Sequence, residues 1–135
     1  MKQPDEIRVL VRNETEIVAA RQKGREMAAQ LGFSATDLTL IATAISEVAR
    51  NILLYGKHGE IVLSLAQRGP KRGLGVVATD VGPGIVNIGQ AMQDGFSTSG
   101  GLGLGLPGVK RLMDEFEVVS KVGHGTTVRF KKWLP

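Results

Sequence analysis

The sequence predicts an α+β fold, a two-layer sandwich in which helices cover one face of a mixed, mostly antiparallel sheet. Three observations support this class. Alternating apolar residues predict strands arranged in hairpins in the middle and at the end of the chain. Apolar residues at helical spacing mark two long segments between the first strand and those hairpins. The 135 residues, 42% of them hydrophobic, are enough for one domain, 1–135, with a normal core.

The first expected elements are a strand and a helix. Residues 7–12 alternate or run apolar, which predicts a strand. Asn13 or Thr15 is a suitable N-cap for the helix that follows, because both side chains accept hydrogen bonds from free backbone amides. That helix is expected to reach about Leu31, where Gly32 ends it.

A second helix is expected directly afterwards. Ser34 is its predicted cap, with Asp37 three residues later in a variant of the capping box. It should run to about Tyr55 and stop at Gly56. One face is predicted to belong to the core, because apolar residues recur there at helical spacing. They are Leu38, Ile41, Ile45, Val48 and Ile52.

The rest of the chain is predicted to alternate strands with glycine-rich connections. The expected elements, in order, are a strand over 59–67, a turn over 70–73, a strand over 74–79, a short helix over 86–93, a polar loop over 95–101, a helix over 104–115, and two strands over 116–121 and 126–132 joined by a turn over 123–125. Hairpins with helices between them favour the antiparallel sheet named above.

Composition excludes several classes of function. Cysteine is absent, so disulfides, thiolate zinc sites and thiol nucleophiles are excluded. The net charge of +4 is scattered along the chain and aromatic residues make up 4%, so no nucleic-acid partner is expected. We expect no membrane partner and a cytoplasmic location, because no signal peptide and no apolar stretch of about 18–20 residues is evident.

Glu47 and Asn51 are the first candidate site residues. They are four residues apart, so they share a helix face, and they lie off the apolar stripe. Magnesium prefers oxygen ligands and usually shares them with substrate phosphates. Asn51 could supply one such oxygen, and Glu47 could orient or deprotonate an attacking hydroxyl. Taken alone, the two residues fit a solvent-facing helix surface better.

Asp80 is the second candidate, at the end of an apolar strand and before Gly82 and Gly84. Its carboxylate only accepts hydrogen bonds, which suits the amino group of adenine. The glycines allow the backbone to approach a flat ring. In isolation, an ordinary strand-to-loop turn explains the same residues. Thr126, at the start of the last strand, could support Asp80 from the neighbouring strand.

A glycine run that enters a helix is the third candidate. Free amides and the helix dipole favour phosphate there, and hydroxyl groups precede it. The residues concerned are Ser97, Thr98, Ser99, Gly100, Gly101, Leu102, Gly103, Leu104 and Gly105. The run follows a polar loop and lacks a lysine-serine or lysine-threonine pair, so it is neither a dinucleotide fingerprint nor a P-loop. A flexible glycine hinge is the alternative.

In this order, the motifs describe a pocket for magnesium-bound ATP, and the chain resembles the GHKL superfamily of ATPases and kinases. Residues 45–51 (ISEVARN) look like the N box, and 80–84 (DVGPG) and 101–105 look like the two glycine boxes. Over essentially its whole length, the chain is most similar to the RsbT-type switch kinases, a branch of the anti-sigma-factor serine/threonine kinases. Residues 94–103 (DGFSTSGGLG) and 106–116 (LPGVKRLMDEF) carry this closer resemblance.

The resemblance implies a Bergerat-type ATP-binding fold and a set of roles. Asn51 would bind magnesium, Asp80 would bind adenine, Glu47 would be the catalytic base, and residues 97–105 would cover the phosphates. Kinases of this branch phosphorylate serine or threonine on STAS-domain scaffold proteins of a stress-signalling complex, the stressosome. Once released, they bind and activate a PP2C-type phosphatase or another effector.

Three alternatives remain open at this stage. The first is a direct anti-sigma factor that also phosphorylates its antagonist. Tyr55, where many anti-sigma kinases have histidine, and the loop 96–99 favour the switch kinases over it. The second is a non-catalytic binding module that uses nucleotide only to set its conformation. The third is a DNA-binding domain, but the sequence shows no recognition helix that would support it.

Overall fold

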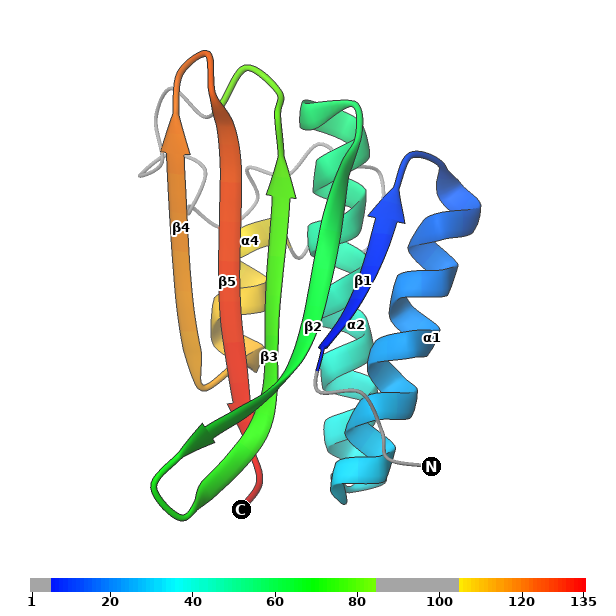
Figure 1. Ribbon diagram of the computed structural model, residues 1–135, viewed down its shortest axis with the longest axis vertical. Coiled ribbons are helices and arrows are strands. Elements are labelled where there is room, and N and C mark those ends of the chain that lie inside the picture. The colour runs from blue at the N-terminus through cyan, green and yellow to red at the C-terminus, as the bar shows by residue number, and fades with distance from the viewer. Residues whose placement is uncertain (1–5, 85–104) are drawn as a thin grey trace.

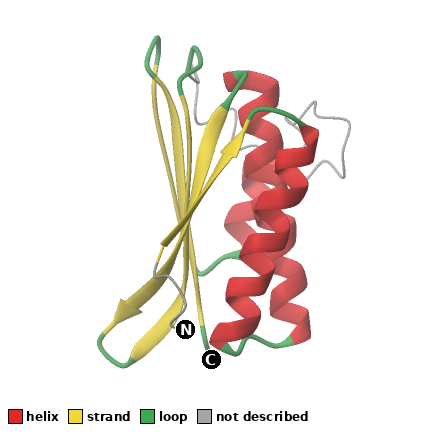
Figure 2. Cartoon of the chain, turned by 45° about the vertical axis from the view of Figure 1, so that its right-hand side comes forward, coloured by secondary structure: helices red, strands yellow, loops and turns green. Residues whose placement is uncertain are grey.

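The computed structural model describes residues 6–84 and 105–135. Its elements are β1 (Glu6–Val11), α1 (Glu14–Leu31), α2 (Ala35–Asn51), the π-helical turn η1 (Ile52–Gly56), β2 (Gly59–Arg68), β3 (Lys71–Asp80), α4 (Gly105–Leu112), β4 (Glu115–Lys121) and β5 (Gly125–Trp133). The strands form one sheet in the order β1-β2-β3-β5-β4 (Figure 1). The helices lie against one face of it (Figure 2). The predicted α+β, two-layer class is therefore confirmed.

The strand pairing is antiparallel at all four described contacts, so no parallel pair of a mixed sheet occurs among these strands. The predicted turn over 70–73 is wrong in its position. Arg68 pairs with Lys71, so the hairpin turns at Gly69 and Pro70, and Gly69 takes the positive φ of 58° that this tight turn requires. The predicted helix over 86–93 and loop over 95–101 lie outside the described residues.

The helix predicted over 104–115 ends earlier, at Leu112. Sheet pairing explains the difference. The Asp114 amide donates to the Lys131 carbonyl at 3.0 Å, and Asp114 accepts from the Trp133 amide at 2.7 Å. These bonds draw the chain into β4, and Glu115 already pairs with Lys131.

Caps fix the starts of both long helices and the end of α1 as the sequence predicts, whereas α2 ends at Asn51, before the predicted Tyr55, and continues as the η1 turn. Asn13 Oδ1 accepts from the Glu16 amide at 3.0 Å, and Gly32 ends α1 with a left-handed φ of 104°. Ser34 Oγ accepts from the Asp37 amide at 3.2 Å. Both helices therefore begin at fixed residues, which sets the position of their buried faces against the sheet.

The core lies between the helices and the sheet, and α2 is its central helix. Fully buried side chains include Ile41, Ile45, Val48, Leu63 and Val76. By length and composition, the helical stretch Ala35–Gly56 could also cross a membrane, with a mean hydropathy of 1.3. This differs from the expectation that no such stretch exists. Its apolarity has a local explanation, because 44% of its apolar window is buried within the protein.

One register row crosses the whole sheet near the end of β3. It joins Val11, Gly59, Asp80, Thr126 and Ser120, which are direct partners on successive strands. Opposite residues in antiparallel strands point to the same face. Asp80 continues the buried Leu74, Val76 and Ala78 positions of β3, so this row faces the helices. The row brings three polar side chains to the helix side of the sheet at one end.

The opposite end of the sheet is held by a cluster around Trp133. Trp133 Nε1 donates to Glu115 at 2.8 Å, and Arg68 donates to the same carboxylate at 2.7 Å. The Arg68 guanidinium also lies 5.1 Å from the centre of the indole ring. The hydrogen bonds from Arg68 and then Trp133 lower the pKa of Glu115. This exposed cluster joins the β2–β3 hairpin to β4 and β5.

Candidate active site

The candidate site lies where several segments that are distant in sequence come together. The C-terminal end of α2, the end of β3 and the turn between β4 and β5 all lie at the upper end of the molecule in Figure 1. The η1 turn connects two of them, because it begins directly after Asn51 and its last residue, Gly56, touches Asp80. The Glu47–Asn51 and Asp80 motifs are therefore parts of one region.

Glu47 is buried, not solvent-facing. It is 3% exposed, although it lies off the apolar stripe of α2. Its Oε2 accepts from the backbone amide of Gly105 at 3.2 Å, and its Oε1 accepts from Arg50 Nη1 at 3.4 Å. The expectation of a plain helix surface is wrong here, because α4 packs over this part of α2. A buried carboxylate needs such partners, since burial without them is costly.

Asn51 is the last residue of α2 and is half-buried. Helical spacing gives it the same face as Glu47. No group of three or more His, Asp or Glu that could hold a metal occurs within 6–84 and 105–135. One amide oxygen is a poor metal site by itself, but it suits magnesium that keeps water and phosphate ligands. The residues present therefore fit a magnesium ion that arrives with a nucleotide.

Asp80 is enclosed by backbone. Its side chain is largely buried, and its Oδ1 accepts from the Gly82 amide at 2.9 Å. A Cβ atom on Gly56 would lie 2.7 Å from that oxygen, and one on Gly125 would lie 2.9 Å from the Asp80 carbonyl carbon. Both distances are too short for real side chains, so these positions require glycine. One carboxylate oxygen is thus fixed by Gly82.

The turn after Asp80 is attached to the β4–β5 hairpin. The Gly123 amide donates to the Pro83 carbonyl at 2.8 Å. Gly84 has a φ of 83°, and a Cβ atom there would lie 2.6 Å from the Lys121 carbonyl oxygen. The positive φ and the close approach both explain glycine at this position.

Thr126 lies opposite Asp80 in the β3–β5 pairing, as the sequence suggests. Its hydroxyl, however, is 2.8 Å from the hydroxyl of Ser120 on β4. Ser120 Oγ also donates to the Gly125 carbonyl at 3.2 Å. Thr126 is therefore part of a small hydroxyl cluster next to Asp80, and its support for Asp80 stays a prediction.

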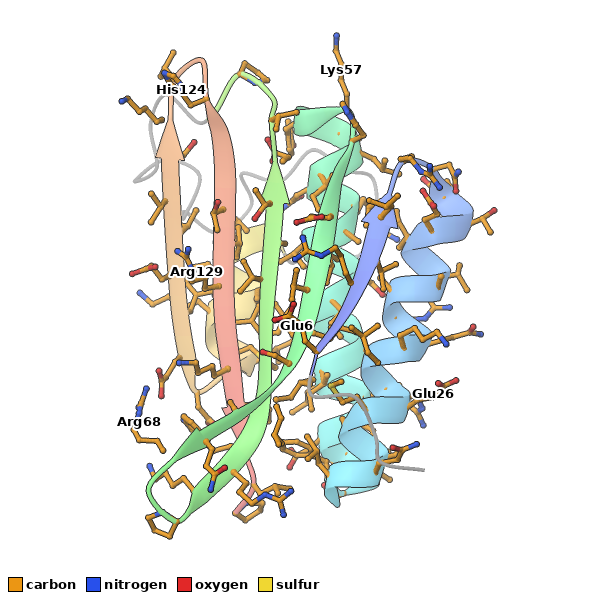
Figure 3. The ribbon with its side chains drawn as sticks, in the orientation of Figure 1. Glu6, Glu26, Lys57, Arg68, His124 and Arg129 are labelled. Carbon is orange, nitrogen blue, oxygen red and sulfur yellow. The ribbon has the colours of Figure 1, made fainter. Side chains whose placement is uncertain are left out.

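A strained turn follows η1. Lys57 has φ 68° and ψ −51°, and the His58 amide donates to the Gly56 carbonyl at 2.8 Å, which is a γ-turn with positive φ. Such a conformation is unfavourable for a residue with a side chain. The turn sets the position of Gly56, which lies against Asp80. The Lys57 side chain itself projects away from the molecule (Figure 3).

The predicted phosphate-binding run is only partly described. Ser97, Thr98, Ser99, Gly100, Gly101, Leu102, Gly103 and Leu104 lie outside the described residues. Gly105 is described: it is buried, has a φ of 57° and begins α4. Its amide is the one that Glu47 accepts from, so the end of the run and the candidate base are in direct contact.

Sequence reasoning missed three residues of this region: Arg50, Gly56 and Ser120. Arg50 had a usable signal, because it is three residues after Glu47 on the same helix. Ser120 also had one, since it continues the inward alternation of Phe116 and Val118 on β4. The sequence marks Gly56 only as a helix stop, and its contact with Asp80 depends on the tertiary fold.

Comparison with known proteins places the chain in a family. The profile of the histidine kinase-like ATPase domain matches residues 10–132. The chain is 56% identical to the serine/threonine-protein kinase RsbT of Bacillus subtilis over 131 residues, which cover 96% of this chain and 98% of that protein. It is 36% identical to the anti-sigma F factor of a Thermoanaerobacter species over 121 residues, covering 85% and 83% of the two chains.

Solved structures support the same fold. A crystal structure of the RsbU and RsbW domains of a Mycobacterium tuberculosis protein matches with a TM-score of 0.68 and 21% identity, over 98% of this chain and 34% of that one. A mycobacterial sensor histidine kinase, MprB, matches with a TM-score of 0.55 and 18% identity, over 95% of both chains. The chain belongs to the histidine kinase-like ATPase family and, within it, to the RsbT-type serine/threonine kinases.

Proposed function

We propose that this kinase transfers the γ-phosphate of magnesium-bound ATP to a serine or threonine of a small STAS-domain protein, with Glu47 as catalytic base. One observation carries the proposal. The Glu47 carboxylate of α2 is buried against the first residue of α4, where it accepts from the Gly105 amide. A helix N-terminus is a favourable place for phosphate. The base would therefore lie next to the expected position of the terminal phosphate.

The chemical step needs one proton acceptor. The oxygen of the protein hydroxyl forms a bond to the γ-phosphorus, and the bond from that phosphorus to the β–γ bridging oxygen breaks. The electron pair of the broken bond leaves with ADP, and the hydroxyl proton goes to a Glu47 carboxylate oxygen. Positioning and charge neutralisation account for most of the catalysis in such transfers. Burial of Glu47 favours a fixed position for the base.

Nucleotide binding is assigned to the other candidate residues of the site. Asn51 would contribute one oxygen ligand to magnesium, which neutralises phosphate charge when bound. Asp80 would accept from the adenine amino group, with Gly82, Gly84 and Thr126 shaping its surroundings. The phosphates would be held by the hydroxyls and amides of residues 97–105. The backbone contacts that fix Asp80 support its role, because binding is stronger when the acceptor is held in place beforehand.

Membership of the family supports a proposal for the partners. We propose that the substrates are STAS-domain scaffold or antagonist proteins of a stressosome-type complex, and that the released kinase activates a PP2C-type phosphatase or another effector. The 56% identity to a protein named RsbT supports this assignment. We also propose that residues 1–135 act as one ATP-binding kinase domain in the cytoplasm.

A direct anti-sigma factor kinase is the second candidate function. It is favoured by one observation, the 36% identity to a protein named anti-sigma F factor over 85% of this chain. Binding to a purified sigma factor would distinguish the two. A switch kinase would bind the STAS-domain protein and not the sigma factor.

The test is transfer of γ-labelled phosphate from magnesium ATP to a purified STAS-domain protein. Label on a serine or threonine that disappears when this residue is changed to alanine supports the proposal. Bound ATP without transfer would instead favour a nucleotide-controlled binding module. Failure to bind ATP would contradict the assignment of the site.

A further inference from the structure

We propose that Arg50 is a positioning residue for the catalytic base Glu47, an inference that rests on the proposed kinase function. Arg50 is three residues after Glu47 on α2, and its Nη1 lies 3.4 Å from Glu47 Oε1. The Arg50 side chain is 30% exposed, whereas the Glu47 side chain is 4% exposed. The guanidinium therefore lies at the boundary between solvent and the buried carboxylate.

Among residues 6–84 and 105–135, the two partners of Glu47 hold different oxygens. Gly105 donates to Oε2 and Arg50 donates to Oε1, so together they fix the orientation of the carboxylate plane. The Gly105 amide begins α4, which is also where phosphate is expected to bind. A phosphate oxygen and the Glu47 carboxylate are both negatively charged, so they repel each other and cannot both accept from the Gly105 amide. When the nucleotide takes this amide, Glu47 loses one of these two described partners.

Of the two described partners, Arg50 is the one that remains. It belongs to the same helix as Glu47, so its contact does not depend on the position of α4 or of the nucleotide. The positive guanidinium also attracts the carboxylate electrostatically across 3.4 Å, which a neutral amide does less. Arg50 would thus determine where the base lies in the loaded enzyme, acting through Glu47 and not on the substrate.

The test is a double-mutant cycle with Arg50→Met and Glu47→Gln, measured as single-turnover phosphate transfer. Arg50→Met alone should lower the rate of transfer between about 10- and 100-fold, as expected when a base is displaced. The KM for ATP should stay within about threefold, because the residue does not hold the nucleotide. Arg50→Lys should recover part of the rate, since it keeps a positive donor near Oε1.

In the Glu47→Gln background, Arg50→Met should change the residual rate by less than about twofold, because the base that it positions is absent. An equal loss in both backgrounds would mean that Arg50 acts on the phosphate or on the fold, and would overturn the inference. So would a large rise in the KM for ATP with an unchanged rate.

Arg129→Met is the matched control. Arg129 forms a similar pair with Glu117 at 3.1 Å, but on the exposed face of the sheet (Figure 3). It should transfer phosphate at the wild-type rate, and thermal unfolding should show all variants folded. Lack of transfer by the wild type would refute the kinase function together with this inference. Normal transfer with additive effects would refute only the role of Arg50.

Discussion

The surroundings of Asp80 and of Glu47 are built in different ways. Asp80 lies among backbone atoms: Gly82 donates to it, and Gly56 and Gly125 approach it more closely than any side chain would allow. Glu47 is held by the Gly105 amide and the Arg50 side chain, and these two groups belong to different elements. The contacts of Asp80 come from segments that are joined by backbone hydrogen bonds, whereas the Gly105 amide belongs to α4 and is the group that a phosphate is proposed to take from Glu47. The Asp80 region therefore suits nucleotide recognition, and the Glu47 region suits chemistry.

Asn51→Ala, in the region of Glu47, should have the largest effect on phosphate transfer. It removes the one proposed protein ligand of magnesium, so phosphate transfer should be abolished. The half-buried side chain at the end of α2 contributes little to the core, so the fold should remain. Transfer assays over a range of magnesium concentrations, with thermal unfolding as control, would measure both. Unchanged turnover would refute the magnesium role.

Glu47→Gln and Glu47→Ala separate chemistry from structure. Both should lower transfer by at least about 100-fold, because the proposed proton acceptor is lost. Glutamine can still accept from the Gly105 amide, so its stability should stay close to that of the wild type. Alanine leaves that buried amide without a partner, which should lower the free energy of unfolding by about 1–3 kcal/mol. Chemical denaturation compares the two, and equal stabilities would contradict the contact with Gly105.

Gly56→Ala tests the enclosure of Asp80. The added Cβ atom would lie 2.7 Å from Asp80 Oδ1, so the carboxylate or η1 must move. ATP affinity should fall about 10-fold or more, corresponding to at least about 1.4 kcal/mol of binding free energy. Gly75→Ala is the matched control, because the nearest atom there is the Ser64 hydroxyl at 3.2 Å. Equal ATP affinity in both variants, measured by calorimetry, would contradict the enclosure.

Asp80→Asn should have a smaller and more selective effect. Asparagine can still accept from the Gly82 amide, but it presents a donor where the adenine amino group needs an acceptor. ATP should bind about 10-fold more weakly, while weak GTP binding should not decrease further. Calorimetric titration with both nucleotides measures this. An equal loss for ATP and GTP would count against adenine recognition by Asp80.

Lys57→Gly should have the smallest effect, in the opposite direction. Glycine adopts the positive φ of 68° in the γ-turn next to Gly56 without the strain that a side chain causes there. Relief of strain of about 1–3 kcal/mol exceeds the entropy that glycine adds to the unfolded chain, so the free energy of unfolding should rise by about 1 kcal/mol. Thermal unfolding would measure this change. A lower melting temperature would mean that the Lys57 side chain contributes contacts of its own.

The same contrast explains what the sequence could predict. Local signals identified Asn13, Ser34 and Gly32 as helix ends, and the α+β class followed from alternation and helical spacing. Glu47 and Asp80 could be named as candidates because their residue types and spacing indicate chemistry. The burial of Glu47 and the contact of Gly56 with Asp80 could not be predicted, because both depend on how distant elements pack.

The most direct test of the account compares Asp80→Asn and Glu47→Gln in one experiment, with the ATP dissociation constant and the rate of transfer to a STAS-domain protein measured for each. We expect Asp80→Asn to weaken ATP binding while saturating ATP restores much of the transfer. We expect Glu47→Gln to bind ATP within a few-fold of the wild type and to transfer almost no phosphate at any concentration. Wild-type transfer by Glu47→Gln, or wild-type ATP affinity in Asp80→Asn, would contradict the division of roles between the two regions.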